Sequence, residues 1–555
     1  MKKLKHTGSE ILIETLIEQG VDTVFGYPGG NVLKIYDELY KTNKIKHITT
    51  SHEQGACHAA DGYARSTGKV GVVIATSGPG ATNLVTGIAT AALDSTPLVA
   101  ICGNVSTSAL GKDSFQEVDI MGVTLPLTKH NYIVKHIQEL ADTIREAFLI
   151  AKSGRCGPVL IDIPQDVQFD VCDYEKKDIV TPIPPPIPSD EDITRAVEMI
   201  NFSKRPFIYS GGGVVLSGAC NELVKLSEEI DAPVGTSMMG LTSIPRKHEN
   251  FVGMTGMHGR YAATNSMMNS DLIIACGTRF SDRATGNKAK FAANIPILHI
   301  DIDQSEINKN IKATHSLVGD LKYILPKLID GANKQKKPLW HNEIQQYKEF
   351  EASKVVPQPD VMTPKNIIEE IQKYTKDDTV IVTDVGQHQM WTTQFYDFIK
   401  PRTLLTSGGL GTMGFGLGAA VGASIASGGK TVVLITGDGS FHMNMIELAT
   451  AVEHKLPIKI FIINNNALGM VKQWQSIFYD NRFSCTLQHK KTDFILAAKA
   501  FGAKGFKAEN IEELHSYIKE AFSSNEVCVV DCHISSDECV LPMIPPNGSI
   551  SDIIM

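Results

Sequence analysis

Two short polar segments in the last third of the chain contain residues that could bind a metal ion and a diphosphate. The strand-like run TVVLIT ends in GDGS (437–440), and the run IKIFII ends in NNN (464–466). Asp438 offers a carboxylate and Asn465 an amide oxygen, and both are hard donors that suit Mg2+. The glycines let the backbone approach a diphosphate, and a helix expected to begin near Asn444 would add N–H donors. We therefore predict a Mg2+–diphosphate site at one edge of a parallel sheet.

The pairing of GDGS with NNN at this spacing resembles the cofactor segment of thiamine-diphosphate enzymes. GDG alone is common where strands turn. Such an enzyme also needs a carboxylic acid against N1′ of the aminopyrimidine, which favours the tautomer whose amine removes the C2 proton. Glu53, in SHEQGACHAADGYAR (51–65), follows a strand-like segment and begins a helix of small residues. An exposed Glu complementing a helix dipole is the alternative, but the flanking Ala and Gly residues favour the catalytic acid.

Short β-branched runs alternate with helical stretches along the whole chain, which predicts the sheets that hold these residues. The runs are apolar throughout, so the expected sheets are parallel and covered on both faces. Ligands then bind beyond the carboxyl ends of the strands. Strands are expected at 70–75, 98–102, 159–163, 207–209, 272–275, 297–302, 380–383, 431–435, 458–463 and 527–532.

Two composition breaks divide the chain into three α/β units, each predicted to be a doubly wound parallel-sheet domain. TPIPPPIP (181–188) is expected to be a stiff linker, and 332–364 is polar, Lys-rich and interrupted by prolines. The predicted domains are 1–178, 190–332 and 364–540, followed by a tail, 541–555.

Composition excludes several classes of function. The 555 residues carry a net charge of −8 and a mean hydropathy of −0.05, which argues against nucleic acid or an anionic membrane as the main partner. The most apolar stretch, Leu84–Cys102, is broken by Asp94 and Pro97, so no membrane span is predicted. No signal peptide is recognised at the start. Ten scattered cysteines without zinc-type spacing fit reduced thiols and a cytoplasmic location.

The chain resembles the large catalytic subunits of the acetohydroxyacid synthase (acetolactate synthase) family from end to end. The motifs that carry the resemblance are GYPGG (26–30), HEQGACHAADGYAR (52–65), TSGPGATN (76–83), SFQE (114–117), GMHG (256–259), GTRFSDR (277–283), GQHQMW (386–391), GLGTMGFG (409–416), GDGSF (437–441) and GMVKQWQ (469–475). The resemblance implies decarboxylation of pyruvate and transfer of the two-carbon unit to a second pyruvate or to 2-ketobutyrate. The products are 2-acetolactate and 2-aceto-2-hydroxybutyrate, on the way to valine, leucine and isoleucine.

The resemblance also implies roles for individual residues at a site holding thiamine diphosphate, Mg2+ and FAD. The resemblance implies that Gly30, Glu53 and Gln116 line the face of the site where the substrate reacts. The residues implied for thiamine diphosphate are Gln387, His388, Gln389, Met413, Gly439, Ser440 and Met470, and those for the metal are Asp438, Asn465 and the carbonyl of Ala467. Trp474 would shape the acceptor pocket, and Arg283 would hold the acceptor carboxylate. For FAD the resemblance implies Arg155, Gly211, Gly212, Gly213, Met257, His258, Gly277, Arg279, Asp301, Ile302 and Asp320.

Three positions depart from the family pattern. Gln165 stands where Lys is usual, Gly418 follows Leu417 where Pro is usual, and Ser281 stands where Asp is common. None of these differences removes a catalytic group. Ser281 weakens the prediction of FAD binding, and Gln165 weakens any prediction that the mouth of the active-site channel is basic. The tail, with Pro542, Met543 and Pro545, matches the segment that covers the site in the family.

Four alternatives stay open on the sequence: a simple 2-keto acid decarboxylase, a catabolic acetolactate synthase without FAD, a pyruvate oxidase, and a non-catalytic scaffold. The first lacks its usual His-His pair here, and intact Glu53, Asp438 and Asn465 disfavour the last. Because Glu53 and Asp438 lie in different domains that must meet on one cofactor, we expect a homodimer or homotetramer. A small regulatory subunit is expected by resemblance alone.

Overall fold

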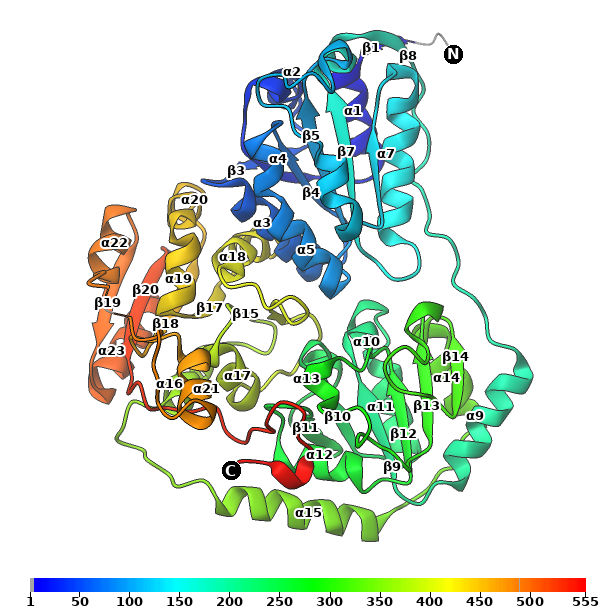
Figure 1. Ribbon diagram of the computed structural model, residues 1–555, viewed down its shortest axis with the longest axis vertical. Coiled ribbons are helices and arrows are strands. Elements are labelled where there is room, and N and C mark those ends of the chain that lie inside the picture. The colour runs from blue at the N-terminus through cyan, green and yellow to red at the C-terminus, as the bar shows by residue number, and fades with distance from the viewer. Residues whose placement is uncertain (1–3, 489) are drawn as a thin grey trace.

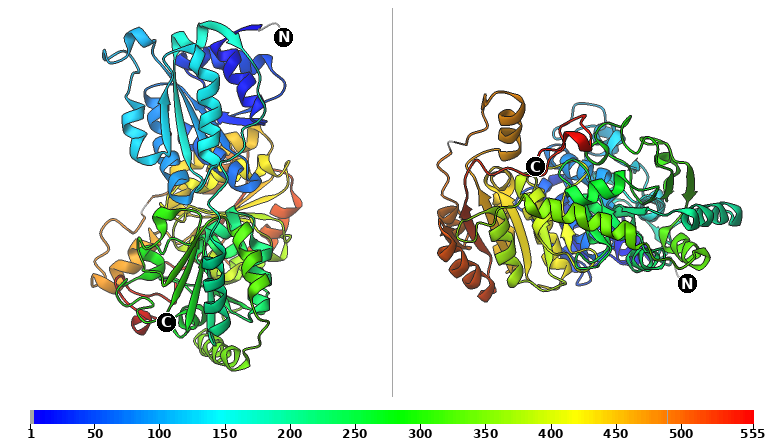
Figure 2. Two further views of the ribbon diagram at one scale, coloured as in Figure 1. Left: turned by 90° about the vertical axis from the view of Figure 1, so that its right-hand side faces the viewer. Right: turned by 90° about the horizontal axis from the view of Figure 1, so that it is seen from below.

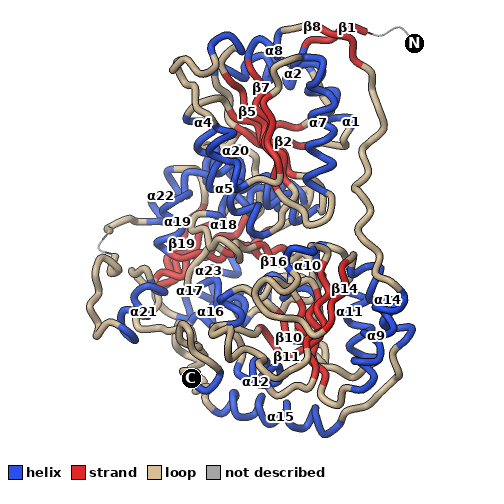
Figure 3. The backbone as a smooth tube through the Cα atoms, turned by 45° about the vertical axis from the view of Figure 1, so that its right-hand side comes forward, coloured by secondary structure: helices blue, strands red, loops and turns tan. Residues whose placement is uncertain are grey.

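The computed structural model describes residues 4–488 and 490–555 and contains three six-stranded sheets, each covered by helices on both faces (Figure 1, Figure 3). Every strand pair within these three sheets is parallel. The predicted α/β class with parallel sheets is therefore confirmed. No helix in the described part of the chain is long and apolar enough to cross a membrane.

The first sheet has the order β3-β2-β4-β5-β7-β6, and a two-stranded antiparallel pair, β1-β8, lies beside it. Its strands are β2 (Thr23–Gly26), β3 (Lys46–Thr49), β4 (Gly71–Ala75), β5 (Leu98–Asn104), β6 (His130–Ile133) and β7 (Pro158–Pro164), with β1 (Leu4–Thr7) and β8 (Val171–Tyr174) in the pair. Its helices are α1 (Gly8–Glu18), α2 (Leu33–Lys41), α3 (Glu53–Thr67), α4 (Pro79–Asn83), α5 (Val85–Asp94), α6 (Ile120–Thr124), α7 (Ile137–Lys152) and α8 (Gln165–Phe169).

The middle sheet has the order β11-β10-β9-β12-β13-β14. Its strands are β9 (Pro206–Ser210), β10 (Val234–Thr236), β11 (Phe251–Met254), β12 (Leu272–Cys276), β13 (Ile297–Asp301) and β14 (His315–Val318). Its helices are α9 (Asp190–Phe202), α10 (Gly212–Leu216), α11 (Cys220–Glu229), α12 (Tyr261–Met268), α13 (Asp282–Thr285) and α14 (Leu321–Gly331).

The third sheet has the order β16-β15-β17-β18-β20-β19. Its strands are β15 (Val380–Thr383), β16 (Leu404–Leu405), β17 (Val432–Gly437), β18 (Ile458–Asn464), β19 (Lys504–Ala508) and β20 (Cys528–His533). Its helices are α16 (Pro364–Lys373), α17 (Gln387–Phe395), α18 (Phe415–Ala426), α19 (Asp438–Asn444), α20 (Leu448–Glu453), α21 (Gly469–Phe478), α22 (Phe494–Ala500) and α23 (Ile511–Ser523).

The two composition breaks differ in structure. Residues 181–188 form no helix or strand and run between the first and middle sheets. The second break instead contains helix α15 (Pro338–Ser353), which lies along the bottom of the molecule in Figure 1. Trp340 on α15 is buried and donates from its indole nitrogen to the carbonyl of Pro206 at 3.1 Å. The helix therefore packs onto the middle sheet, although it belongs to a segment of the sequence that is mostly polar.

Helices α3 and α18, both rich in small residues, join the first and third domains. A Cβ at Gly422 of α18 would lie 1.9 Å from the carbonyl oxygen of Ala59, and one at Gly62 of α3 would lie 2.3 Å from that of Ala419. Only glycine permits two helix backbones to approach so closely. Seen from the side in Figure 2, the first domain consequently sits on the third.

Candidate active site at the strand ends

Asp438 and Asn465 lie at the same edge of the third sheet, as predicted from their place in the sequence. Strands β17 and β18 are parallel neighbours, and Gly437 pairs with Ile463. The predicted start of the following helix near Asn444 was wrong, because α19 begins directly at Asp438. Asp438 thus occupies the first turn, where a helix dipole favours an acidic residue, and the GDGS amides form the N-terminus of the helix.

Asp438 is buried, and this burial raises the pKa of its carboxyl group to about 7. Within residues 4–488 and 490–555 it forms no ion pair, and no group of three His, Cys, Asp or Glu side chains could hold a metal ion. A divalent cation would compensate the buried charge, using amide and carbonyl oxygens as its other ligands. The Asn465 amide nitrogen donates to Oε1 of Gln387 at 2.9 Å, while its oxygen accepts from the Ala467 amide at 3.1 Å. The donor set therefore fits Mg2+.

The three residues 387–389 at the start of α17 point in different directions. Gln387 bonds to Asn465 and donates to Oε1 of Gln473 at 3.0 Å. His388 lies against Gly437, where a Cβ would be 2.7 Å from its Nδ1, and its buried Nε2 has no partner among described residues. Burial lowers the pKa of His388 to about 3, so the ring is neutral. Gln389 instead donates to Oγ1 of Thr406 at 2.7 Å and supports the loop after β16.

Met413 reaches the GDGS segment from that loop. A Cβ at Gly439 would lie 3.7 Å from Cε of Met413 and 2.8 Å from Cδ2 of Leu468. The Ser440 hydroxyl donates to the carbonyl of Val385 at 2.8 Å, so it also holds the end of β15. Met470 is half-buried on α21 and packs against the apolar core behind the sheet. Four neighbouring strand ends thus bring the expected thiamine residues together.

The residues implied for the reacting face surround the turn after β4 in the first domain. Glu53 begins α3 and accepts a hydrogen bond from the Asn83 side chain at 2.9 Å, and a Cβ at Gly80 would lie 3.3 Å from its Oε1. The carbonyl oxygen of Gln116, a residue with φ +59°, lies 2.8 Å from the Cβ position of Gly78. Gly30 has open space where a side chain would project.

In the part of the chain that the structure describes, the side-chain hydrogen bond of Glu53 is made within the first domain, to Asn83. No hydrogen bond or ion pair among the described residues joins it to Asp438 or Asn465. The two residues before it do reach across: the amides of Ser51 and His52 donate to Glu447 at 3.1 and 3.0 Å. The third domain therefore holds the start of α3, while the Glu53 carboxylate turns toward Asn83.

Arg283 and Trp474, assigned to the acceptor pocket from different domains, are in contact. The Arg283 guanidinium carbon lies 5.6 Å from the centroid of the Trp474 ring, within cation–π range. Arg283 also donates to the sulfur of Met257 at 3.5 Å. The C-terminal tail contacts Met257 as well, because the Ile544 amide donates to its carbonyl at 2.8 Å.

The residues implied for FAD gather at the carboxyl edge of the middle sheet. Gly211 and Gly213, after β9, cross Gly277, after β12, so closely that a Cβ at Gly211 would lie 2.1 Å from the Gly277 carbonyl oxygen. Asp301 ends β13, and burial raises the pKa of its carboxyl group to about 6. Ile302 follows it directly and is half-buried.

Of the other residues implied for FAD, Asp320, Arg155 and Arg279 already have partners, whereas Nε2 of the His258 ring has none within residues 4–488 and 490–555. Asp320 caps α14 through the Lys322 amide at 2.8 Å. His258 is buried, its Nε2 has no hydrogen-bond partner among the described residues, and burial lowers the pKa of the ring to about 4. Arg155 donates to Ser95 Oγ at 2.9 Å and to Glu306 at 2.7 Å, and Arg279 donates to the Leu93 carbonyl at 2.6 Å. An orphaned ring nitrogen, close glycine backbones and two arginines at one sheet edge fit a dinucleotide.

Sequence reasoning missed three buried charged residues that organise the site: Arg65, Asp94 and Glu447. Arg65 stands in the HEQGACHAADGYAR motif, four residues after Asp61, which is the helical spacing for an ion pair. Asp94 interrupted an otherwise apolar run, and a charge at such a place was the available signal. Nothing in the sequence near Glu447 distinguishes it.

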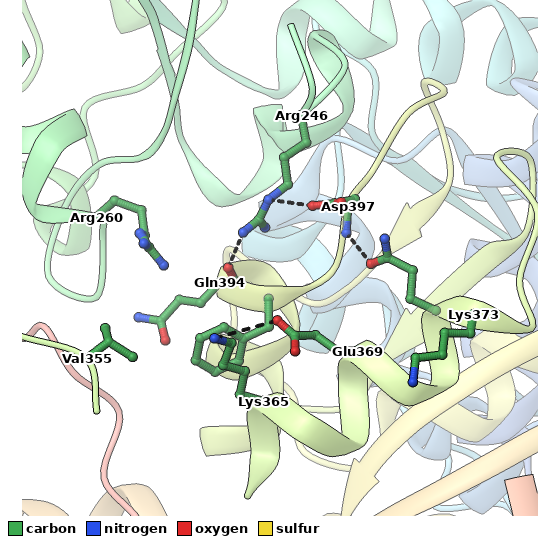
Figure 4. Close-up of a pocket in the computed structure, with 10 residues that line it drawn as sticks. Arg246, Arg260, Val355, Lys365, Glu369, Lys373, Gln394 and Asp397 are labelled. Atoms are coloured by element: carbon green, nitrogen blue, oxygen red, sulfur yellow. Dashed lines mark hydrogen bonds and ion pairs between the residues drawn. The ribbon is translucent and has the colours of Figure 1, made fainter. Parts of the chain in front are cut away.

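A cavity of about 450 Å³ between the middle and third domains lies apart from this site (Figure 4). Arg246 lines it, pairs with Asp397 at 2.9 Å and donates to the carbonyl of Tyr396 at 2.9 Å. The positive charge of Arg246 thereby stabilises the partial negative charge of the carbonyl oxygens at the C-terminal end of α17. None of the residues implied for catalysis or cofactors lines the cavity, and the contacts of Arg246 join the middle and third domains beside it.

Comparison with known proteins gives three family matches in chain order. Residues 6–123 match the N-terminal thiamine pyrophosphate (TPP) binding domain of thiamine pyrophosphate enzymes, residues 193–328 their central domain, and residues 384–532 their C-terminal TPP binding domain. A probable acetolactate synthase large subunit from Methanocaldococcus jannaschii is 44% identical, over 99% of this chain and 95% of that protein. The acetolactate synthase isozyme 3 large subunit of Escherichia coli is 41% identical, over 99% and 98%.

Proposed function

This chain belongs to the acetolactate synthase large-subunit family of thiamine-diphosphate enzymes, and from that premise we propose how its residues carry out the reaction. Pyruvate is decarboxylated, and its two-carbon unit is joined to a second pyruvate or to 2-ketobutyrate. The products are 2-acetolactate and 2-aceto-2-hydroxybutyrate, intermediates toward valine, leucine and isoleucine. The observation that carries the proposal is the meeting of Asp438 and Asn465 at the ends of β17 and β18.

Mg2+ is held, in this proposal, by the side chains of Asp438 and Asn465 and the carbonyl of Ala467. A cation bound there would favour the ionised form of the buried Asp438 carboxyl group, because it would replace the solvation that burial removed. When bound, thiamine diphosphate supplies the carbon nucleophile that adds to the keto group of pyruvate and accepts the electrons released with CO2. The GDGS amides at the N-terminus of α19 bind the diphosphate.

Glu53 holds or releases a proton at N1′ of the aminopyrimidine, and Asn83 orients its carboxylate. Among residues 4–488 and 490–555, no hydrogen bond or ion pair joins Glu53 or Gln116 to Asp438 or Asn465 of the same chain. We propose, as the family resemblance implies, that a second copy brings its diphosphate site to this face, so that the active unit is a homodimer with two sites. Assembly to a homotetramer is compatible with this arrangement.

Arg283 binds the carboxylate of the acceptor keto acid, and Trp474 forms the wall that meets its alkyl group. The guanidinium suits a carboxylate because it donates two parallel hydrogen bonds. The larger ethyl group of 2-ketobutyrate gains contact area against an aromatic ring, and one methylene is worth about 1–3 kcal/mol of discrimination. The contact between Arg283 and Trp474 keeps the two functions in one pocket.

FAD occupies the edge of the middle sheet in this proposal, with a structural role. The overall reaction consumes no electrons, so the flavin has no redox step to perform. The residues that would hold it are the glycines after β9 and β12, Asp301, and the arginines Arg155 and Arg279. A small regulatory subunit is proposed as a partner because the relatives are named large subunits.

Product analysis tests the proposal. Purified protein is given pyruvate and 2-ketobutyrate with Mg2+ and thiamine diphosphate, with and without FAD. Formation of both acetohydroxy acids, lost on removal of the flavin, is the expected result. Acetaldehyde as the main product would identify a decarboxylase, full activity without flavin would identify the catabolic type, and flavin bleaching by pyruvate without oxygen would identify an oxidase.

A further inference from the structure

Residues from all three domains meet at the C-terminal end of α5, at three successive positions that we call the α5 junction: Leu93, Asp94 and Ser95. The Leu93 carbonyl accepts from Arg279 of the middle domain at 2.6 Å. The Asp94 carboxylate accepts from the third domain, and the Ser95 hydroxyl accepts from Nε of Arg155 at 2.9 Å. Ser95 ends the helix in the left-handed region, with φ +59°, which turns it away from the axis.

Asp94 holds the loop that follows β16. Its Oδ1 accepts from the Gly409 amide at 2.7 Å, and its Oδ2 accepts from the Gly408 amide at 3.2 Å. Oδ2 also accepts from Nη2 of Arg65 at 3.0 Å, and Arg65 itself donates to the carbonyl of Thr406 at 2.8 Å. A Cβ at Gly409 would lie 2.7 Å from the Leu93 carbonyl oxygen. Backbone and carboxylate are therefore fitted to each other.

The same loop carries Met413, the residue expected to support the cofactor's bent shape. The hydroxyls of Thr412 and Thr90 are 2.7 Å apart, so α5 holds the loop at a second point. The Gly414 amide donates to Asp384 at 2.8 Å. Met413 lies between these two anchored residues, and its position depends on them.

The α5 junction also contacts residues at the carboxyl edge of the middle sheet. Arg279 and Arg155 are both implied for FAD, and both bond to the junction. A second route runs through Met239: its sulfur lies 2.5 Å from the Cβ position of Gly408, and its Cβ lies 3.0 Å from that of Gly212. Met239 thus contacts both Gly212, which is expected at the flavin, and Gly408, in the loop that carries Met413.

The junction is electrostatically constrained. Arg65 lies among Asp61 and Asp94, and all three side chains are almost fully buried. Burial alone would lower the pKa of Arg65, but the two carboxylates raise it, so the guanidinium stays charged. A buried ion cluster tolerates little rearrangement, because losing one partner leaves an uncompensated charge. We therefore expect a displacement of Arg279 or Arg155 to move the loop after β16, and a displacement of that loop to move the two arginines.

We propose that Asp94 is a positioning residue that couples the flavin site of the middle domain to the thiamine-binding loop of the third. The inference rests on the proposed function, since it takes both cofactors as bound at the edges described above. Ordering of Arg279 and Arg155 by FAD fixes the end of α5, and Asp94 then fixes the loop before Met413. Because binding free energies are reciprocal, FAD and thiamine diphosphate each raise the affinity for the other by the same factor.

Titration calorimetry on the full-length cofactor-free protein measures this factor. Thiamine diphosphate with Mg2+ is titrated at zero and at saturating FAD, and FAD is then titrated with and without thiamine diphosphate. We expect the wild type to show the same factor in both directions, of about 5- to 150-fold. Asp94→Asn, which keeps the shape and removes the charge, should reduce the factor to less than twofold. Asp190→Asn, an exposed aspartate at the start of α9, is the matched control and should keep the wild-type factor.

Each outcome decides the matter. Coupling in the wild type and in Asp190→Asn but not in Asp94→Asn supports the inference. FAD binding without any effect on thiamine diphosphate affinity overturns it while leaving the proposed function intact, as does unchanged coupling in Asp94→Asn. Failure of the wild type to bind FAD overturns both. If Asp94→Asn does not fold, Ser95→Ala, which removes only the bond to Arg155, takes its place: a smaller factor supports the inference and an unchanged factor overturns it.

Discussion

Glu447 offers a test of how the third domain positions the catalytic helix of the first. It follows Met445 and Ile446 in a short 3-10 helix and has no exposed surface. Its Oε1 accepts from the His52 amide at 3.0 Å, and its Oε2 accepts from the Ser51 amide at 3.1 Å and from the Thr450 hydroxyl at 2.6 Å. Glu53 directly follows His52 in the chain and is the first residue of α3. The hydrogen bonds between Glu447 and the amides of Ser51 and His52 therefore fix where α3 begins.

The two substitutions Glu447→Gln and Glu447→Ala should differ in size. Gln keeps an acceptor for His52, its NH2 can donate to the Thr450 hydroxyl, and the Ser51 amide can bind water because Ser51 is exposed. The cost is then one charge-assisted hydrogen bond, about 1.5–3 kcal/mol. Ala removes every acceptor and leaves a cavity, which costs about 3–5 kcal/mol. A shift of about 1 Å at Glu53 would lower kcat roughly 100-fold.

Urea denaturation and steady-state kinetics at saturating cofactors provide the two measurements. The denaturation midpoint should fall in the order wild type, Glu447→Gln, Glu447→Ala, and kcat should fall in the same order. Glu453→Ala, an exposed glutamate on the neighbouring α20, is the control and should change neither. Wild-type kcat in Glu447→Ala, even with a lowered midpoint, would refute the claim that Glu447 positions Glu53.

Three further predictions follow from the site. Glu53→Gln should lower acetolactate formation about 100-fold or more without moving the thermal midpoint, since the carboxyl group acts in proton transfer; unchanged product formation would remove Glu53 from catalysis. Trp474→Leu should shift the product ratio toward 2-acetolactate by about 5- to 100-fold in competition experiments, while an unchanged ratio would place the alkyl group of the acceptor away from Trp474. Burial raises the pKa of Asp438 from 3.8 to about 7, so the stability due to its protonated form is complete below pH 3.8 and is lost as pH rises to 7, on the order of 4 kcal/mol. Metal-free Asp438→Asn should therefore unfold at a higher temperature than the wild type at pH 8, with a gap that narrows toward pH 5 and closes when Mg2+ is added; a gap independent of pH would contradict this.

The strand ends that carry chemistry could be predicted from the sequence. Runs such as VVLIT before GDGS and IKIFII before NNN are apolar enough to form only buried parallel strands, so Asp438 and Asn465 had to reach one sheet edge. This inference needs only local pattern and the geometry of parallel sheets. The helix start was misjudged because the two glycines of GDGS are poor helix formers, whereas in the fold Asp438 and the free amides favour a helix there.

The polar, proline-interrupted break between the middle and third domains shows a second limit. Its composition indicated a connection, yet 338–353 forms α15 because Trp340 and Ile344 find a core to bury against. Helix propensity was weak there, and tertiary packing decided the outcome.

What the sequence determined by itself was which residues are available for chemistry and which strand each one follows, because both depend on neighbours in the chain. Only the tertiary structure decided which of them touch. Arg283 and Trp474 are 191 positions apart in the chain and meet because the middle and third domains pack together. Asp94 was visible only as a charge in an apolar run, and its partners Gly408 and Gly409 come from another domain. Such contacts depend on how whole sheets and helices pack, through distances that no local pattern of residues encodes.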